Sequence, residues 1–110
     1  MIEDTISQIE SRIQTSDALN EERRQELLGL VRTLKNEVTR LSETHHEQAQ
    51  SIAGFTEVST HEATRTEQNP QLLKYSLAGL NSSVEGFEKS HPTLVQIVGA
   101  ISNTLSNLGI

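Results

Sequence analysis

Residues 27–41 read LLGLVRTLKNEVTRL, and this stretch decides the fold of the chain. Its apolar side chains recur at alternating spacings of 4 and 3 residues, and the spacing continues through His45 and Gln48 to Ile52 and Phe55. In a heptad, the β-branched members fall at position a and the leucines at position d, the pattern of a seam between two supercoiled helices. The sequence therefore predicts a helix that associates with another helix.

The composition favours a helical bundle over an α/β enzyme. The chain has 110 residues, no Trp and only three aromatic side chains, which are Phe55, Tyr75 and Phe87. A helical seam needs only aliphatic residues, whereas a mixed core usually holds more bulky ones. The net charge of −6 argues against nucleic acid as a partner, and the absence of cysteine excludes disulfides and thiolate metal sites.

The N-terminal part is predicted to form a helical hairpin. Isoleucines at positions 2, 6, 9 and 13 define a first helix over about residues 2–15. Asn20 is a suitable N-cap for a second helix, with two glutamates in its first turn. We expect this second helix to run on as one long central helix to about residue 66. The alternative is a helix that ends near Leu41 and is followed by a polar linker.

The C-terminal part is predicted to form a second hairpin. Asn69 and Pro70 have the types expected at N-cap and N1 of a third helix, and His91 and Pro92 repeat the arrangement for a fourth. Gly109 is expected to act as a left-handed C′ cap. The predicted fold is all-α, with an N-terminal unit over 1–68 and a C-terminal hairpin over 69–110.

The C-terminal sequence resembles a known family. The runs SLA (76–78), FEKSHPTL (87–94) and LSNLGI (105–110) are similar to a family of short bacterial helical proteins catalogued as a domain of unknown function. The similarity, with its signature FExSHPxL…LSNLGI, is close over 72–110 and looser over 1–41. The resemblance implies an all-helical fold and a bacterial origin, and it supplies no activity.

Association is the predicted role of the apolar stripes. Residues 92–110 carry no charged side chain, so the last helix is expected to be covered on more than one side. We expect a homodimer or a dimer of dimers, in which the polar pair His45 and Gln48 fixes the register of the seam. The predicted interface consists of Leu27, Val31, Leu34, Val38, Leu41, His45, Ile52, Phe55, Leu94, Val98, Ile101 and Leu105.

The predicted function is that of a non-catalytic, oligomerising interaction or scaffold module in the cytoplasm, without a cofactor. No Gly-x-Ser-x-Gly elbow and no glycine-rich phosphate loop occurs, and no secretory signal is visible at the start of the sequence. One alternative is a di-iron-like metal protein that uses two Glu-x-x-His pairs: Glu43 with His46, and Glu88 with His91. Another is association with a membrane surface through the uncharged last helix.

Overall fold

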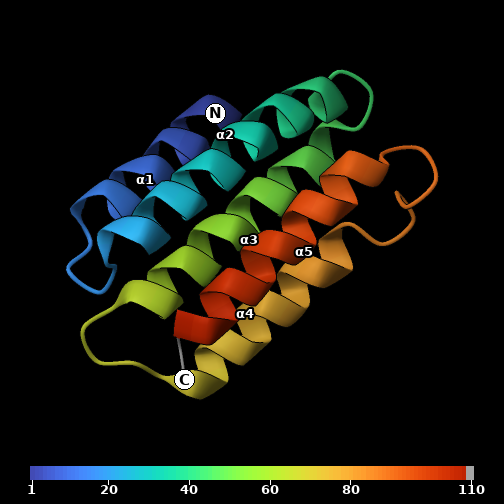
Figure 1. Ribbon diagram of the computed structural model, residues 1–110. Helices are drawn as coiled ribbons and strands as arrows, with labels where there is room; N and C mark the ends of the chain where they lie inside the picture. The colour runs from blue at the N-terminus through green and yellow to red at the C-terminus, as the bar shows by residue number, and fades with distance from the viewer. Residues whose placement is uncertain (109–110) are drawn as a thin grey trace.

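A computed structural model describes residues 1–108 of the chain as five α-helices (Figure 1). Each helix runs antiparallel to the one before it, so α1, α3 and α5 point the same way. The helices are α1 (Ile2–Thr15), α2 (Glu21–Ser42), α3 (His46–Thr64), α4 (Pro70–Ser83) and α5 (Pro92–Leu108).

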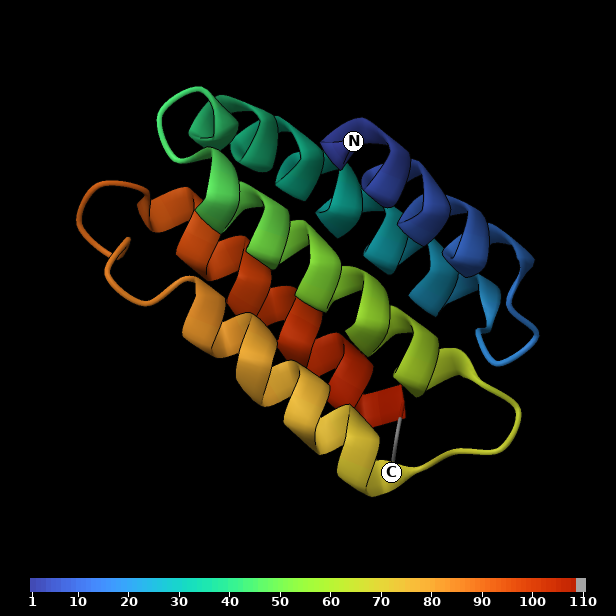
Figure 2. The same cartoon turned by 180° about the vertical axis from the view of Figure 1, so that it is seen from behind.

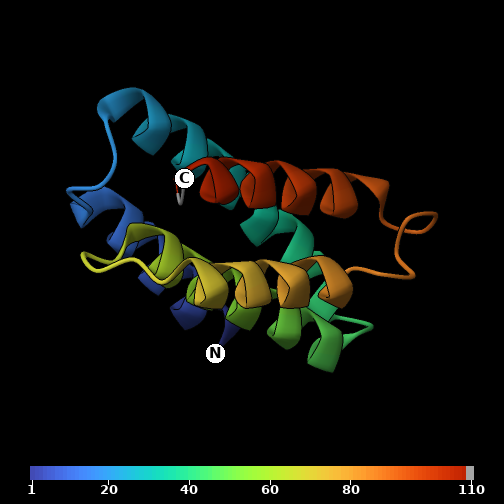
Figure 3. The same cartoon turned by 90° about the horizontal axis from the view of Figure 1, so that it is seen from below.

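The helices pack in two layers. α1, α3 and α4 lie side by side with α3 in the middle, and α2 and α5 cover one side of that layer (Figures 2 and 3). α3 contacts all four other helices, whereas α4 contacts only α3 and α5 within the described chain. The opposite side of α3 and α4 is therefore left without a covering helix.

The helix starts follow the predicted capping chemistry. Asn20 accepts a hydrogen bond from the backbone N–H of Arg23 (2.8 Å). Asn69 accepts from the N–H groups of Gln71 (3.1 Å) and Leu72 (3.2 Å), with Pro70 as the first helical residue. These bonds satisfy donors that have no partner inside the helix. The predicted starts of the second, third and fourth helices are confirmed for α2, α4 and α5.

The apolar stripes of all five helices meet in one core. The four isoleucines of α1 face the buried leucines and valines of α2, which confirms the predicted N-terminal hairpin. α5 is covered by α2, α3 and α4, and two of its hydroxyls bond to neighbouring helices: Ser102 to Asn81 (3.1 Å) and Thr104 to Glu26 (3.0 Å). Its lack of charged side chains is explained by this covering within one chain.

The prediction of one long central helix is wrong. α2 ends at Ser42, the chain turns through residues 43–45, and α3 begins at His46. The Ser42 hydroxyl donates to the carbonyl of Thr39 (2.7 Å), and the backbone N–H of Glu43 bonds to the carbonyl of Arg40 (3.3 Å) instead of that of Thr39, so the regular helical pattern of bonds is broken at this point. The linker alternative places the helix end correctly but misses α3, whose segment is helical rather than irregular.

α3 has a weak apolar pattern because its buried side chains, apart from Ile52, are small or polar. They include Ala49, Ala53 and Ala63 together with Thr56 and Thr60, whose hydroxyls donate back to carbonyls four residues earlier. Such residues let neighbouring helices approach the central one closely, while they give a weak apolar pattern in the sequence.

The glycines have separate roles. Gly86, in the α4–α5 connection, has φ of +93°, a conformation that favours glycine. Gly79 lies against the side chain of Phe55 from α3, whereas the space beside Gly99 is open. The predicted C′ cap at Gly109, and Ile110 after it, lie outside the described residues.

Candidate interaction surface and polar cleft

The predicted interface residues are packed inside a single chain. All of them except His45 and Phe55 are buried in the core formed by the five helices. α2 turns its stripe toward α1, α3 and α5, so the 4-3 spacing is satisfied by neighbours in the same chain. The buried members therefore do not form a surface that a second copy could reach.

The exposed apolar side chains gather instead on α3 and α4. Apart from Met1, every large apolar side chain that is exposed among residues 1–108 belongs to these two helices. The exposed fractions are 40% for Phe55, 46% for Val58, 43% for Leu72 and 62% for Tyr75. These residues lie on the side of α3 and α4 that none of the described helices covers.

Phe55 joins the two helices into one surface. A Cβ atom added to Gly79 of α4 would clash with the Phe55 ring, so the ring lies directly on the α4 backbone. In the antiparallel pair, helical spacing then brings Val58 near the level of Tyr75. We call this surface the α3–α4 face; it consists of Ser51, Gly54, Phe55, Val58, Leu72, Tyr75, Gly79 and Ser82.

None of these eight residues is charged, although the chain carries 15 acidic residues. The one charged residue of α4, Lys74, lies beside Leu77 and Asn81 in a groove that is also lined by Ser106 of α5. Uncharged, partly apolar surfaces of this kind are typical of protein contacts.

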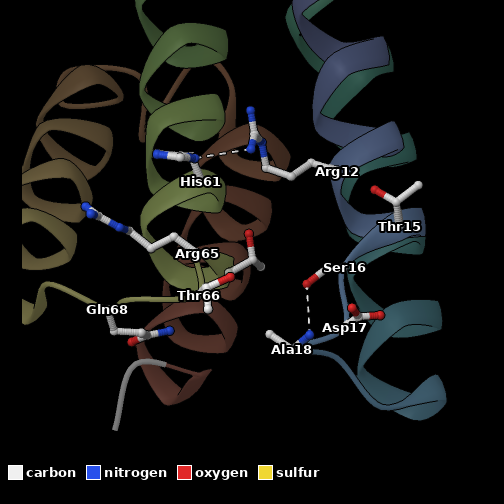
Figure 4. Close-up of a pocket in the computed structure, with 10 residues that line it drawn as sticks. Arg12, Thr15, Ser16, Asp17, Ala18, His61, Arg65, Thr66 and Gln68 are labelled. Carbon is white, nitrogen blue, oxygen red and sulfur yellow. Dashed lines mark hydrogen bonds between the residues drawn. The ribbon is translucent and has the colours of Figure 1, made fainter.

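A polar cleft of about 730 Å³ opens at one end of the bundle, between the last turns of α1 and α3 and the connections that follow them (Figure 4). Arg12 of α1 points across it toward His61 of α3, and a guanidinium nitrogen lies 3.1 Å from the imidazole Nδ1. The rest of the wall is rich in hydroxyls, from Thr15, Ser16, Thr64 and Thr66.

Arg24 of α2 binds the C-terminal end of α1 and the connection that follows it. Its guanidinium donates to the carbonyls of Ile13, Gln14 (3.0 Å), Ser16 (3.1 Å) and Leu19 (3.0 Å). The C-terminal carbonyls of α1 are thus neutralised by a partly buried cation. Nothing in the spacing of the sequence singled out this arginine, because its partners are backbone groups of another element.

A protein-family model matches almost the whole chain. Residues 2–110 match the family described as Domain of unknown function (DUF4404). The chain belongs to the DUF4404 family. No curated protein and no solved structure matches it. The resemblance expected from the C-terminal sequence is confirmed, and the match extends over both hairpins of this DUF4404 chain and over α3 between them.

The histidines at the opposite end of the bundle form an aromatic cluster. The rings of His45 and His91 each meet the edge of Phe87, with centroids 5.4 Å and 5.5 Å from it, and lie 6.4 Å from each other. Each Nδ1 is bonded to the preceding hydroxyl, from Thr44 (2.8 Å) or Ser90 (2.9 Å). His45 is thus half-buried against the second hairpin of its own chain.

The four residues of the metal alternative do not converge. Glu43, His46 and Glu88 are exposed, and His91 belongs to the aromatic cluster. Among residues 1–108, no group of three or more His, Asp or Glu side chains is placed to hold a metal ion. None of the described helices has the length and apolar character needed to cross a bilayer. Association of the last helix with a membrane surface is a separate hypothesis and stays a prediction.

Proposed function

We propose that this DUF4404 chain is a non-catalytic cytoplasmic interaction module that associates with a second copy of itself through the α3–α4 face. The observation that supports the proposal is the concentration of exposed apolar side chains on that face. Large exposed apolar groups are usually scattered on a monomer, and a contiguous set marks a contact site. The association that the heptad seam predicts is thereby assigned to different residues.

A second copy fits this face better than a strongly charged partner does. The chain has a net charge of −6, so most approaches between two copies bring carboxylates together. The eight residues of the α3–α4 face add no charge to that repulsion, because all of them are uncharged. Two copies related by a twofold axis would place α3 and α4 of each chain in a four-helix arrangement, in which both chains use the same face.

The small residues of the face support close approach. Ser51, Gly54 and Ser82 add little bulk beside the larger side chains, so the helices of a partner could reach the backbone of α3 and α4. The four large side chains are each only partly exposed, so the area available is small for a stable dimer. The expected association is therefore weak, with a dissociation constant on the order of micromolar.

Light scattering behind size exclusion tests the proposal over a hundredfold range of protein concentration. The wild type is expected to shift from one chain toward two as concentration rises. Val58→Glu and Tyr75→Glu, which add charge at exposed positions, should hold the protein at one chain. Thr39→Glu adds the same charge at an exposed position of α2 and should leave the association unchanged.

Two results would overturn the proposal. One is a wild-type mass of a single chain at every concentration. The other is a dimer that persists unchanged in both the Val58→Glu and Tyr75→Glu variants. Circular dichroism of each variant establishes that the five-helix fold is intact, so that a change in mass reports association rather than unfolding.

A further inference from the structure

The contact between Arg12 and His61 fixes the protonation of the imidazole. A guanidinium has donors only, so the Nδ1 atom that lies 3.1 Å from it must act as the acceptor. His61 is therefore neutral in this arrangement, with its proton on Nε2. A protonated His61 has donors at both nitrogens and cannot keep this bond.

The charge of Arg12 is not neutralised by the protein. Among the described residues, no carboxylate lies within 4.0 Å of its guanidinium. The C-terminal carbonyls of α1, which would attract it, are already taken by Arg24. At the end of α3, the side chain of Gln68 donates to the carbonyl of Ala63 (2.6 Å). One of the C-terminal carbonyls of α3 therefore also has a donor already. The arginine charge is thus free to act on a ligand in the cleft.

The walls of the cleft add uncommitted hydroxyl donors. The Ser16 hydroxyl accepts from the N–H of Ala18 (3.1 Å), which leaves its own hydrogen free. The Thr66 side chain has no hydrogen-bond partner among the described residues, and both groups line the same cleft as Arg12. The hydroxyls of Thr15 and Thr64 already donate to helix carbonyls and are available only as acceptors.

We infer that this cleft binds a small oxyanion between Arg12 and His61, and that binding is coupled to the uptake of one proton by His61. The Arg12–His61 hydrogen bond breaks, the imidazole takes a proton on Nδ1, and both side chains then donate to the anion. Phosphate, sulfate and carboxylate groups share the required chemistry. The inference is independent of the proposed self-association, because the cleft and the α3–α4 face use different residues.

The other charged groups near His61 set the limits of the site. The Oε2 atom of Glu62 in α3 lies 4.0 Å from Nε2 of His61, and the same carboxylate is paired with Arg65 (2.9 Å). In Figure 4, Arg65 extends away from Arg12, so it is not a second clamp on the ligand. Asp17, in the α1–α2 connection, lines the cleft and opposes an anion. Arg12 alone only balances the negative charge of Asp17. The proposal therefore requires a second positive charge, which His61 supplies when it takes up a proton.

Sulfate is the appropriate probe because its charge stays constant across the pH range in which histidine titrates. Binding is followed by NMR chemical shifts of the His61 ring and the Arg12 guanidinium, at constant ionic strength set with chloride. We expect sulfate to perturb both groups and to bind about tenfold more tightly at pH 5.5 than at pH 8. Arg12→Gln should weaken binding by about tenfold at pH 5.5.

His61→Gln separates sulfate binding from its coupling to protonation. This variant should bind sulfate weakly, and its affinity should not depend on pH. His46→Gln and Arg23→Gln remove a histidine and an arginine that do not line the cleft, and should leave sulfate binding as in the wild type. Wild-type binding that does not change between pH 5.5 and 8, or binding that survives Arg12→Gln unchanged, would overturn the inference. All variants are compared after thermal melts show the same fold.

Discussion

The ring of Phe55 lies on the backbone of Gly79, and this contact joins α3 to α4 at the surface of the bundle. Any residue larger than glycine at position 79 would displace the ring. The consequence is an aromatic side chain that is held in the groove between two helices while still 40% exposed. The same contact therefore bears on the stability of the helix pair and on the proposed association.

Replacing glycine by alanine should have opposite results at two positions of the bundle. Gly54→Ala adds a methyl group into open space and should stabilise α3 by about 0.5–1 kcal/mol. Gly79→Ala has the same gain in helix propensity, but it must push the Phe55 ring aside and should be less stable than Gly54→Ala by about 1 kcal/mol. Urea denaturation of both variants measures the difference, and equal stabilities would contradict the Phe55–Gly79 contact.

Shortening a side chain of the predicted heptad seam should destabilise the fold of each chain rather than an interface between chains. Leu34 is fully buried among neighbours of its own chain, so Leu34→Ala should lower the free energy of unfolding by about 2–5 kcal/mol. The loss should be the same at low and high protein concentration when measured by chemical denaturation. A loss that grows as the protein is diluted would instead place Leu34 in an interface between copies.

Removing the Arg24 side chain should destabilise the α1–α2 connection. Arg24→Gln leaves carbonyls of four residues without their charged donor and should cost about 2–3 kcal/mol. Arg23→Gln is the matched control, since no side-chain hydrogen bond or ion pair is found for Arg23 in the described structure. Denaturant titration of the pair checks the prediction, which fails if both variants unfold at the same midpoint.

Glu21 should give the α1–α2 connection a pH dependence. The hydrogen bond from Gln25 lowers the pKa of the Glu21 carboxyl below its ordinary value, with a further contribution from Arg24. A lowered folded-state pKa means that the stabilisation is complete above the unfolded value and is lost as pH falls through the folded one. NMR titration of the Glu21 carboxyl should show this shift, and Gln25→Ala should move the pKa back toward the ordinary value. An unchanged midpoint in Gln25→Ala would contradict this assignment of the cause.

The two candidate sites differ in how far the sequence could reveal them. The heptad spacing predicts Phe55 as an interface residue, and Phe55 is exposed, whereas the apolar residues at the other heptad positions are buried. Val58, Leu72 and Tyr75 lie outside the apolar repeats at spacings of 4 and 3, so the sequence did not predict the α3–α4 face. The cleft was missed entirely, because Arg12 and His61 are 49 residues apart and meet only where α1 and α3 pack side by side.

Local chemistry determined which segments become helices and where most of them begin. The spacing of Ile2 to Ile13 and of Leu27 to Leu41, the N-caps Asn20 and Asn69, and Pro70 and Pro92 act over a few residues, so they can be read without neighbours. Tertiary structure decided that the chain turns at residues 43–45 and that α2 is covered by its own chain. Burial depends on which helix lies opposite, and an apolar stripe has the same spacing whether its partner is the next helix or a second copy.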